Sequence, residues 1–439
     1  MDAFYERALT ITPGAAQTMS KQHARYGAGM PTFLESGRGV YVYAPDDSTG
    51  YIDWIASLCA VTLGHARPEL HDALCNASTV GGTFAMPHPL EVTVGERFLN
   101  AVGWPEGMVR WCSTGSEATE GAVRIARMAT GRDLILSVGY HGWHSTWTAA
   151  KDHHPGVPEV FRHVLVDVPL QEVPLWIKTK PGQVAAVILE PCAETPPDGP
   201  LLQFIVDTAH ADGALVISDE IIAGFRWHEA GAMLGTCHVL PDLVCYGKAI
   251  ANGTFPIAAI VGPPDLMRHA WPVSGTANGH PIGLAAVNAV LDIYEREEPL
   301  VELHRAGRTL RHSLRGLAMT ADGTAAGLQV SGDDPRPVVK IHSEPRTNGF
   351  SPTAADLDAS VRQRNNVGQT LLVQELAKRG VLWHPAGAGN AMVGHGAVLA
   401  ETVDAFAGAL MIVATAMRTD TPEAWLEGAP SASVLAVRP

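Results

Sequence analysis

Short apolar runs alternate with helical patterns between residues 108 and 262, and this alternation constrains the fold more than any other feature. Six such runs predict strands, at residues 108–112, 134–138, 184–190, 214–218, 243–246 and 255–262. Continuous apolar runs separated by helices are typical of strands that a parallel sheet buries on both faces. We expect such helices at 116–130, ended by Gly131, and at 201–211. The segment therefore predicts an α/β domain.

The flanking segments predict further structure on either side of this domain. Residues 37–54 predict a hairpin with Asp46, Asp47 and Ser48 in its turn, and a long helical stretch is expected near 281–320. A chain of 439 residues is also too long for one simple core. We therefore expect an N-terminal arm with part of a small domain, a large α/β domain and a C-terminal small α+β domain, at residues 1–55, 56–310 and 311–439.

Charge and cysteine content argue against several classes of function. The formal net charge of −14 supplies no cationic field for a nucleic acid or an anionic membrane. The six cysteines form no C-x-x-C pair, so free thiols are expected rather than a disulfide scaffold. The first residues lack a signal-peptide pattern, and we expect no run near the roughly 18 apolar residues of a membrane span. These features predict a cytoplasmic, enzyme-sized protein.

Ligands of open parallel sheets collect beyond the carboxyl ends of the strands. Four segments with candidate ligand-binding or catalytic residues lie at such ends. In the first, WCSTGSEATEGAVRIAR (111–127), a strand ends and a helix opens at Ser116 after Gly115. The free N–H groups at a helix start can bind a phosphate. The alternative is an ordinary N-capped helix with Glu117 and Glu120 in its first turns.

The second segment, VGYHGWH (138–144), places Tyr140 and Trp143 after a predicted strand. Aromatic rings there can stack on a flat heterocycle, although a packed loop is the plainer alternative. The histidines of this region also suggest a metal, but acidic or cysteine ligands at a suitable spacing are lacking, so we expect none; these histidines are His141, His144, His153 and His154.

The third and fourth segments place a carboxylate and a lysine at strand ends. Asp219 and Glu220 follow the run at 214–218, where a carboxylate needs a cationic partner such as a protonated pyridine nitrogen. A helix cap or a metal ligand is the alternative. Lys248 follows the run at 243–246, and partial burial would make it a competent Schiff-base amine. The alternative is a lysine whose amine reaches solvent.

A phosphate cradle, a stacking aromatic, a carboxylate for a pyridine nitrogen and a Schiff-base lysine are together the parts of a pyridoxal-phosphate (PLP) site. The motifs STGSEATEGA, YHG, ILEP, SDEIIAGFR, YGKAIANG and GTANGHP occur here in that order. In this respect the chain resembles the class-III aminotransferases, which are PLP enzymes of fold type I. The resemblance extends from PGAAQT (13–18) to HGAVLAETVDAF (395–406). It implies a large domain with a mostly parallel central sheet flanked by helices, plus a small α+β domain formed by both termini.

The resemblance also implies roles for individual residues. Lys248 would hold PLP as a Schiff base and move the proton, and Asp219 would keep the pyridine nitrogen protonated. Tyr140 and Ile221 would cover the two faces of the ring. Thr276 would reach the phosphate of a neighbouring subunit, which implies a homodimer. The catalytic residues expected are Lys248, Asp219 and Tyr140, and the cofactor-binding residues are Gly115, Ser116, Tyr140, His141, Glu190, Asp219, Ile221, Lys248 and Thr276.

Within the class, PGAAQT, VTLGHARPEL and the ANG after Lys248 are similar to the glutamate-1-semialdehyde aminomutase group. The chain departs from that enzyme where PGAAQTMSK replaces PGGVNSPVR, with Lys21 at the position of its arginine and Arg25 nearby, and where GKAIANG replaces GKIIGGG. We therefore expect an aminotransferase that moves an amino group from an amino acid to a small ketone, aldehyde or keto-sugar. Candidate substrate-facing residues are Lys21, Arg25, Trp143 and Arg226, and Arg226 could equally be a structural charge.

Other functions remain open. A semialdehyde-type aminomutase, or a racemase or epimerase, would use the same Lys248, Asp219 and Tyr140. A dinucleotide-binding oxidoreductase is suggested only by AGAGNAMVG (386–394), where Met392 occupies the third glycine position far from an opening βαβ unit. A non-catalytic relative with the same fold is disfavoured because Lys248 and Asp219 are present.

Overall fold

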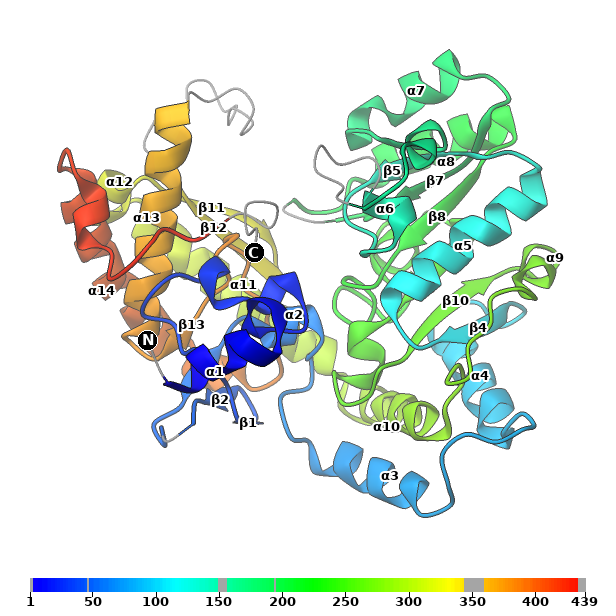
Figure 1. The fold of residues 1–439 in the computed structure, drawn as a ribbon, viewed down its shortest axis with the longest axis horizontal. Coiled ribbons are helices and arrows are strands. Elements are labelled where there is room, and N and C mark those ends of the chain that lie inside the picture. Colours follow the sequence, from blue (N-terminus) through cyan, green and yellow to red (C-terminus); the bar gives the residue numbers. More distant parts are fainter. Residues whose placement is uncertain (1–2, 46, 149–155, 193–194, 343–358, 433–439) are drawn as a thin grey trace. The chain divides into compact units, whose positions relative to one another are not determined.

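The computed structural model describes residues 3–45, 47–148, 156–192, 195–342 and 359–432. The chain divides into two compact units (Figure 1). The terminal unit comprises residues 1–56, 63–65 and 302–439, and the central unit comprises 57–62 and 66–301. The boundaries expected from the sequence fall after residues 55 and 310. Each unit is described by itself.

The central unit is built on a seven-stranded sheet with the order β4-β10-β9-β8-β7-β5-β6. The strands from β9 to β6 are parallel to one another, so the mostly parallel sheet is confirmed. The bounds are β4 Met108–Cys112, β5 Leu134–Val138, β6 Leu165–Asp167, β7 Val184–Leu189, β8 Leu215–Asp219, β9 Leu243–Tyr246 and β10 Ala258–Gly262.

The prediction of a parallel strand at 255–262 is wrong, because β10 pairs antiparallel with both β4 and β9. Its residues are fully buried, as a parallel strand's would be. Its direction follows from the connection, which holds only the short turn η7 (Lys248–Ala251). A parallel connection needs a crossover of a dozen or more residues, usually with a helix.

Helices cover both faces of this sheet (Figure 1). On one face, α5 packs against β10, β9 and β7. On the other, α7 and α8 contribute to a core that contains Val187 and Leu189 of β7, whereas Ile188 belongs to the α5 side. The helices are α3 Pro68–Ser78, α4 Pro89–Ala101, α5 Gly115–Thr130, α6 Ser145–Thr148, α7 Val173–Thr179, α8 Gly199–Asp212, α9 Pro264–Met267 and α10 Pro281–Glu297.

The terminal unit joins the two ends of the chain in one small sheet, of order β1-β2-β3-β13. Strand β13 (Val381–Leu382) pairs parallel with β3 (Tyr51–Asp53), and β2 (Tyr41–Tyr43) pairs antiparallel with β3 and with β1 (Ser36–Arg38). The expected hairpin is therefore present, with β1 added; Asp46 of its turn lies outside the described residues. The remaining elements of this unit are α1 Ala3–Ile11, α11 Pro299–Ala318, α12 Ala321–Ala326, β11 Leu328–Asp333, β12 Arg336–Ile341, α13 Ala359–Ala377 and α14 Leu399–Met417. The short α2 (Ala56–Cys59) has all but its first residue in the central unit.

Helix α14 corrects one expectation from the sequence. Residues His395–Met417 are long and apolar enough to cross a membrane by length and composition alone. However, Phe406, Leu410 and Val413 of this helix are buried, and α14 packs against α12 and α13. Such burial along one face of the helix is the pattern of a core helix of the terminal unit.

Candidate functional site

Asp219 ends β8 as a buried carboxylate, only 4% exposed. Its Oδ2 lies 2.7 Å from Nδ1 of His141, and its Oδ1 accepts a hydrogen bond from the Ile221 N–H at 3.1 Å. Within the described part of the chain, no arginine or lysine is paired with it. A buried carboxylate whose one titratable partner is a histidine can accept a further cationic donor.

Glu190 follows β7, the strand beside β8, and its Oε2 accepts a hydrogen bond of 2.9 Å from the Tyr140 N–H. Gly139 has a φ of 109°, and a Cβ there would collide with the Glu190 carboxylate. Burial raises the pKa of Glu190, and the nearby Asp219 raises it further, whereas His141, the Tyr140 N–H and Lys248 lower it. The edge of the sheet thus brings two carboxylates, a histidine and a lysine within electrostatic range.

Lys248 begins η7, two residues after the end of β9, and β9 is the neighbour of the strand β8 that ends at Asp219. It is partly exposed and has a φ of 46°, in the left-handed region that costs energy for a residue other than glycine. The next residues, Ala249 to Ala251, are buried. Asn252 accepts a hydrogen bond of 2.8 Å from the Thr62 N–H through its side chain. The surrounding structure therefore holds this lysine in a strained backbone conformation.

The turn between β4 and α5 is shaped for an anion. Thr114 caps the helix by accepting from the Glu117 N–H, and the Glu117 carboxylate accepts from the N–H groups of Ser113 and Thr114. The N–H groups of Gly115 and Ser116, in the first turn of α5, have no acceptor among the described residues. Both the open donors and the helix dipole favour a phosphate here.

Ile221 connects this turn to the lysine segment. A Cβ on Gly115 would lie 3.1 Å from the Ile221 side chain, and a Cβ on Gly247 would lie 3.0 Å from it. The Ile221 side chain therefore packs against the glycine that precedes Lys248 and the glycine that opens α5. Tyr140 and Trp143 are 62% and 70% exposed, so both rings have a free face.

The chemical nature of these N–H, carboxylate and amine groups fits PLP. Open N–H groups match its phosphate, the buried Asp219 matches a protonated ring nitrogen, and Lys248 supplies an amine. No three His, Cys, Asp or Glu side chains of the described chain gather as metal ligands, and His153 and His154 lie outside it.

The other candidate residues belong to the terminal unit or have different contacts. Lys21 (in η2, Met19–Lys21) and Arg25 (in η3, His23–Arg25) belong to the terminal unit. Thr276 is exposed in the loop before α10, and Asn278 in the same loop accepts a hydrogen bond of 3.1 Å from the Ser113 hydroxyl. Gly387 bonds to β12 through its backbone instead of opening a helix, unlike a dinucleotide-binding turn.

Arg226 has the contacts of a structural charge, the alternative that the sequence left open. It is completely buried, and its Nη2 donates to the carbonyl oxygens of Cys59 at 3.3 Å and Val61 at 2.9 Å. Ser57, Leu58 and Cys59 all have left-handed φ angles between 49° and 72°. Arg226 therefore holds a strained turn in place.

The sequence indicated Glu220 as a carboxylate at a strand end, but it did not indicate which groups this side chain binds. The Glu220 carboxylate accepts hydrogen bonds from the Ser218 hydroxyl and from the N–H groups of Ala232 and Met233, at 2.8 to 2.9 Å. Burial raises its pKa to about 7, although these hydrogen bonds lower it. Glu220 anchors the turn η6 (Ala232–Thr236) to the end of β8. The adjacent Asp219 and Glu220 at a strand end indicated two buried carboxylates. The sequence does not indicate that Glu220 bonds to η6 and Asp219 to His141.

The chain is similar to known proteins of one family. The model of the family "Aminotransferase class-III" matches residues 23–332. The chain is 32% identical over 341 residues to a glutamate-1-semialdehyde 2,1-aminomutase of Hyperthermus butylicus, covering 72% of this chain and 78% of the relative. It is 33% identical over 329 residues to the protein of that name from Anaeromyxobacter sp., covering 68% and 75%.

Solved structures resemble the whole chain. An omega-transaminase from Sphaerobacter thermophilus is 26% identical, with a TM-score of 0.79 over 92% of this chain and 96% of that one. A transaminase with PLP bound is 24% identical, with a TM-score of 0.81 over 95% and 98%, a likeness that shows the fold alone.

Proposed function

Since this chain belongs to the class-III aminotransferases and is a PLP enzyme, we propose that it transfers an amino group from an amino-acid donor to a small ketone, aldehyde or keto-sugar. The observation that carries the proposal is the position of Lys248, Asp219 and Glu190 at the carboxyl ends of three neighbouring parallel strands. The open N–H groups at the start of α5 support it, because they belong to the same unit and the same sheet edge.

Bound PLP supplies an electron sink that stabilises negative charge at the substrate carbon. We assign its phosphate to the N–H groups of Gly115 and Ser116 and its ring nitrogen to the Asp219 carboxylate. Tyr140 and Ile221 would hold the two faces of the ring. Each of these groups orients the cofactor, so the substrate carbon is presented in one geometry.

Lys248 has two roles in the proposal. Its amine would hold the cofactor covalently, and once an amino donor has taken that place, Nζ would be free to take the proton from the alpha carbon of the donor and to hold it for return. A partly exposed lysine at the start of η7, within electrostatic range of the Glu190 carboxylate, suits both roles. Glu190 would hold the Tyr140 loop against the ring through the Tyr140 N–H.

Several assignments belong to the same proposal. Lys21, Arg25 and Trp143 are proposed to face the substrate, whereas the buried Arg226 has a structural role in its described contacts. We propose a cytoplasmic homodimer in which Thr276 reaches the phosphate of the neighbouring subunit. Its exposure in a loop supports a contact outside its own chain.

The test is an absorbance spectrum of the purified protein with a panel of amino donors. We expect a cofactor band that bleaches with a donor and recovers when a keto acid is added. Lys248→Ala should lose the band of the covalently held cofactor, while Lys180→Ala, a change on the connection before β7, should keep it. A band that persists while alpha protons exchange with solvent would instead indicate a racemase or epimerase.

An aminomutase is the second candidate, because the two curated relatives carry that name. An aminomutase moves an amino group within one molecule and needs no separate carbonyl acceptor. Turnover of glutamate 1-semialdehyde without an added keto acid would favour it. Turnover that requires an amino donor and a different carbonyl acceptor would favour the transamination.

A further inference from the structure

Three buried polar atoms, one of them on the histidine that bonds Asp219, have no hydrogen-bond partner among the described residues. They are Nε2 of His141, Nε1 of Trp147 and Oε2 of Glu120. His141 and Trp147 are 3% and 4% exposed. Buried polar groups are paired almost everywhere in folded proteins, because an unpaired one is costly, so each of these atoms is expected to have a partner.

The three side chains come from the start of α5 and from the segment 141–147, and these two segments are hydrogen-bonded to each other. The Thr119 hydroxyl donates to the His141 carbonyl at 2.6 Å, and the Thr146 hydroxyl donates to Glu120 Oε1 at 2.8 Å. The rings of His141 and Trp147 meet edge to face, with centroids 5.2 Å apart. Thr119 precedes Glu120 and Thr146 precedes Trp147, so these bonds link the two segments that carry the three atoms.

The atoms are complementary in hydrogen bonding. The indole N–H of Trp147 is a donor, the Glu120 carboxylate oxygen is an acceptor, and the histidine nitrogen can be either. A buried water typically makes about three hydrogen bonds to groups of this kind. A single water that reaches all three atoms would satisfy them.

We propose that one buried water joins Glu120, Trp147 and His141, and that Glu120 is a positioning residue for Asp219. The path runs from the Glu120 carboxylate through the water to Nε2 of His141, and from Nδ1 of His141 to the Asp219 carboxylate. Fixing the imidazole from both sides fixes the carboxylate that it bonds. The effect on the cofactor rests on the proposed role of Asp219, whereas the water site does not.

The water site is tested by a high-resolution crystal structure. We expect one ordered water within about 2.7–3.2 Å of His141 Nε2, Trp147 Nε1 and Glu120 Oε2. An absence of density there, or side chains too far apart to share one water, would overturn the proposal whether or not the chain is an aminotransferase.

The positioning role is tested by titrating PLP into the apoprotein. Glu120→Leu removes the acceptor and should weaken PLP binding about tenfold, the effect of one lost hydrogen bond to a charged group. Glu120→Gln retains an acceptor and should restore most of the affinity. Thr146→Val should weaken binding as well, whereas Thr148→Val, in the same short helix α6 but without a bond to Glu120, should not.

Two further comparisons separate this role from general destabilisation. Trp147→Phe should weaken PLP binding, while Trp111→Phe, which removes an equally unpartnered buried indole N–H from β4, should not. His141→Asn keeps a donor for Asp219 but has no second ring nitrogen, so Glu120→Leu should have no further effect in that background. Additive effects of the two changes, with unchanged urea midpoints, would contradict the path through His141. A wild-type apoprotein that binds no PLP would count against the proposed function and not against the water.

Discussion

Oδ2 of Asp219 and Nδ1 of His141 lie 2.7 Å apart, although one residue ends β8 and the other follows β5. Strand β7 lies between these two strands, so the hydrogen bond crosses over the end of a third strand. The histidine thereby orients the carboxylate, which has its other oxygen bonded to the Ile221 N–H. The bond links the loop that carries Tyr140 to the residue proposed to hold the ring nitrogen of PLP.

Asp219→Asn removes the negative charge while keeping the shape of the side chain. We expect kcat to fall on the order of a hundred- to a thousandfold, because a neutral amide cannot hold the ring nitrogen protonated. Steady-state kinetics with saturating PLP measures the effect. Asp207→Asn, on the exposed face of α8, serves as the matched control and should leave kcat unchanged. Equal rates for Asp219→Asn and the wild type would remove Asp219 from the mechanism.

Arg226→Leu leaves the carbonyl groups of Cys59 and Val61 without their buried donor. We expect the free energy of unfolding to fall by about 3 kcal/mol, at roughly 1–3 kcal/mol for each unpaired group. Urea unfolding measures the change, with the exposed Arg162→Leu as control. Unchanged stability together with a raised KM for the substrate would instead support the substrate-facing role.

Glu220 should make the stability of the protein depend on pH. Its pKa is raised from 4.5 to about 7 by burial, so between these values the folded state holds a proton that the unfolded state has released. Stability is therefore complete below about pH 4.5, falls as the pH rises toward 7 and levels off above that. The loss amounts to roughly 3 kcal/mol.

Glu220→Gln should remove this dependence, because the amide does not titrate. Urea midpoints at pH 5 and pH 8 give the comparison, with the exposed Glu106→Gln as control. The wild type and the control should both lose stability over this range. A Glu220→Gln protein that loses as much as the wild type would show that another group is responsible.

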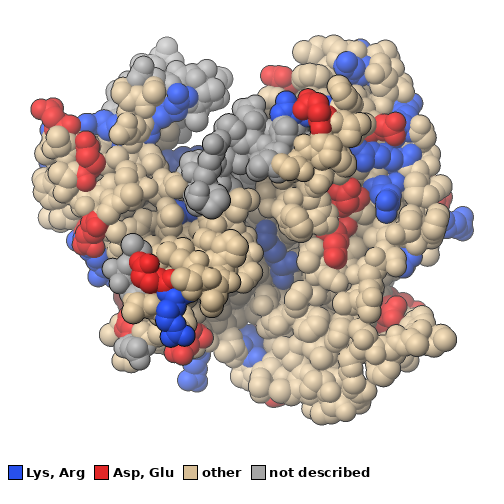
Figure 2. All heavy atoms as spheres, viewed as in Figure 1, with Lys and Arg blue, Asp and Glu red and all other residues tan. Residues whose placement is uncertain are grey.

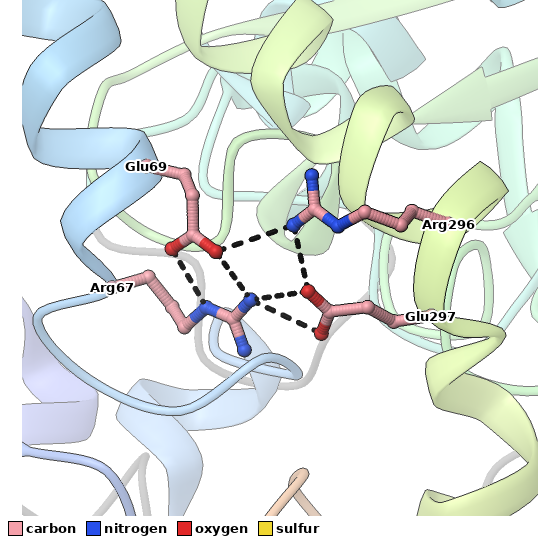
Figure 3. A network of polar contacts seen from close by, with 4 residues as sticks. All are labelled: Arg67, Glu69, Arg296 and Glu297. Carbon is pink, nitrogen blue, oxygen red and sulfur yellow. Dashed lines mark hydrogen bonds and ion pairs between the residues drawn. The ribbon is translucent and has the colours of Figure 1, made fainter.

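Four charged residues join the start of α3 to the end of α10 (Figure 3). Arg67 Nη2 lies 2.9 Å from an oxygen of Glu297, and Arg296 is bonded to both Glu297 and Glu69. Arg67 and Glu297 are 19% and 33% exposed. A double-mutant cycle of Arg67→Gln and Glu297→Gln should give a coupling of about 0.5–1 kcal/mol.

The coupling should decrease in 1 M salt, since charges near the surface are screened. On the face drawn in Figure 2, basic and acidic side chains are interspersed. A coupling that is unchanged by salt would mean that the pair is more desolvated than its exposure indicates.

Many strand and helix bounds of the central unit could be predicted, because they follow from short stretches of sequence. The apolar runs at β4, β5 and β9 give the strand bounds residue for residue, and Gly131 ends α5 with a left-handed φ of 67°. Strand β6, with three residues, is too short to stand out as an apolar run. The direction of β10 depends on its connection rather than on its own residues.

The rest depends on contacts between distant segments. The pairing of β3 with β13 joins residues more than 300 positions apart, and nothing in either run identifies its partner. The bond between Asp219 and His141 requires the strand order, which the sequence did not provide. The contacts of Arg226 likewise depend on where the turn at Cys59 folds back.

The central claim is that PLP is carried on Lys248. Borohydride reduction of the holoprotein, followed by proteolysis and mass spectrometry, locates the cofactor directly, because reduction makes the link to the lysine permanent. The account predicts that the modified peptide contains Lys248 and that Lys248→Ala yields no modified peptide. A cofactor found on another lysine, or equal labelling of Lys248→Ala and the wild type, would contradict it.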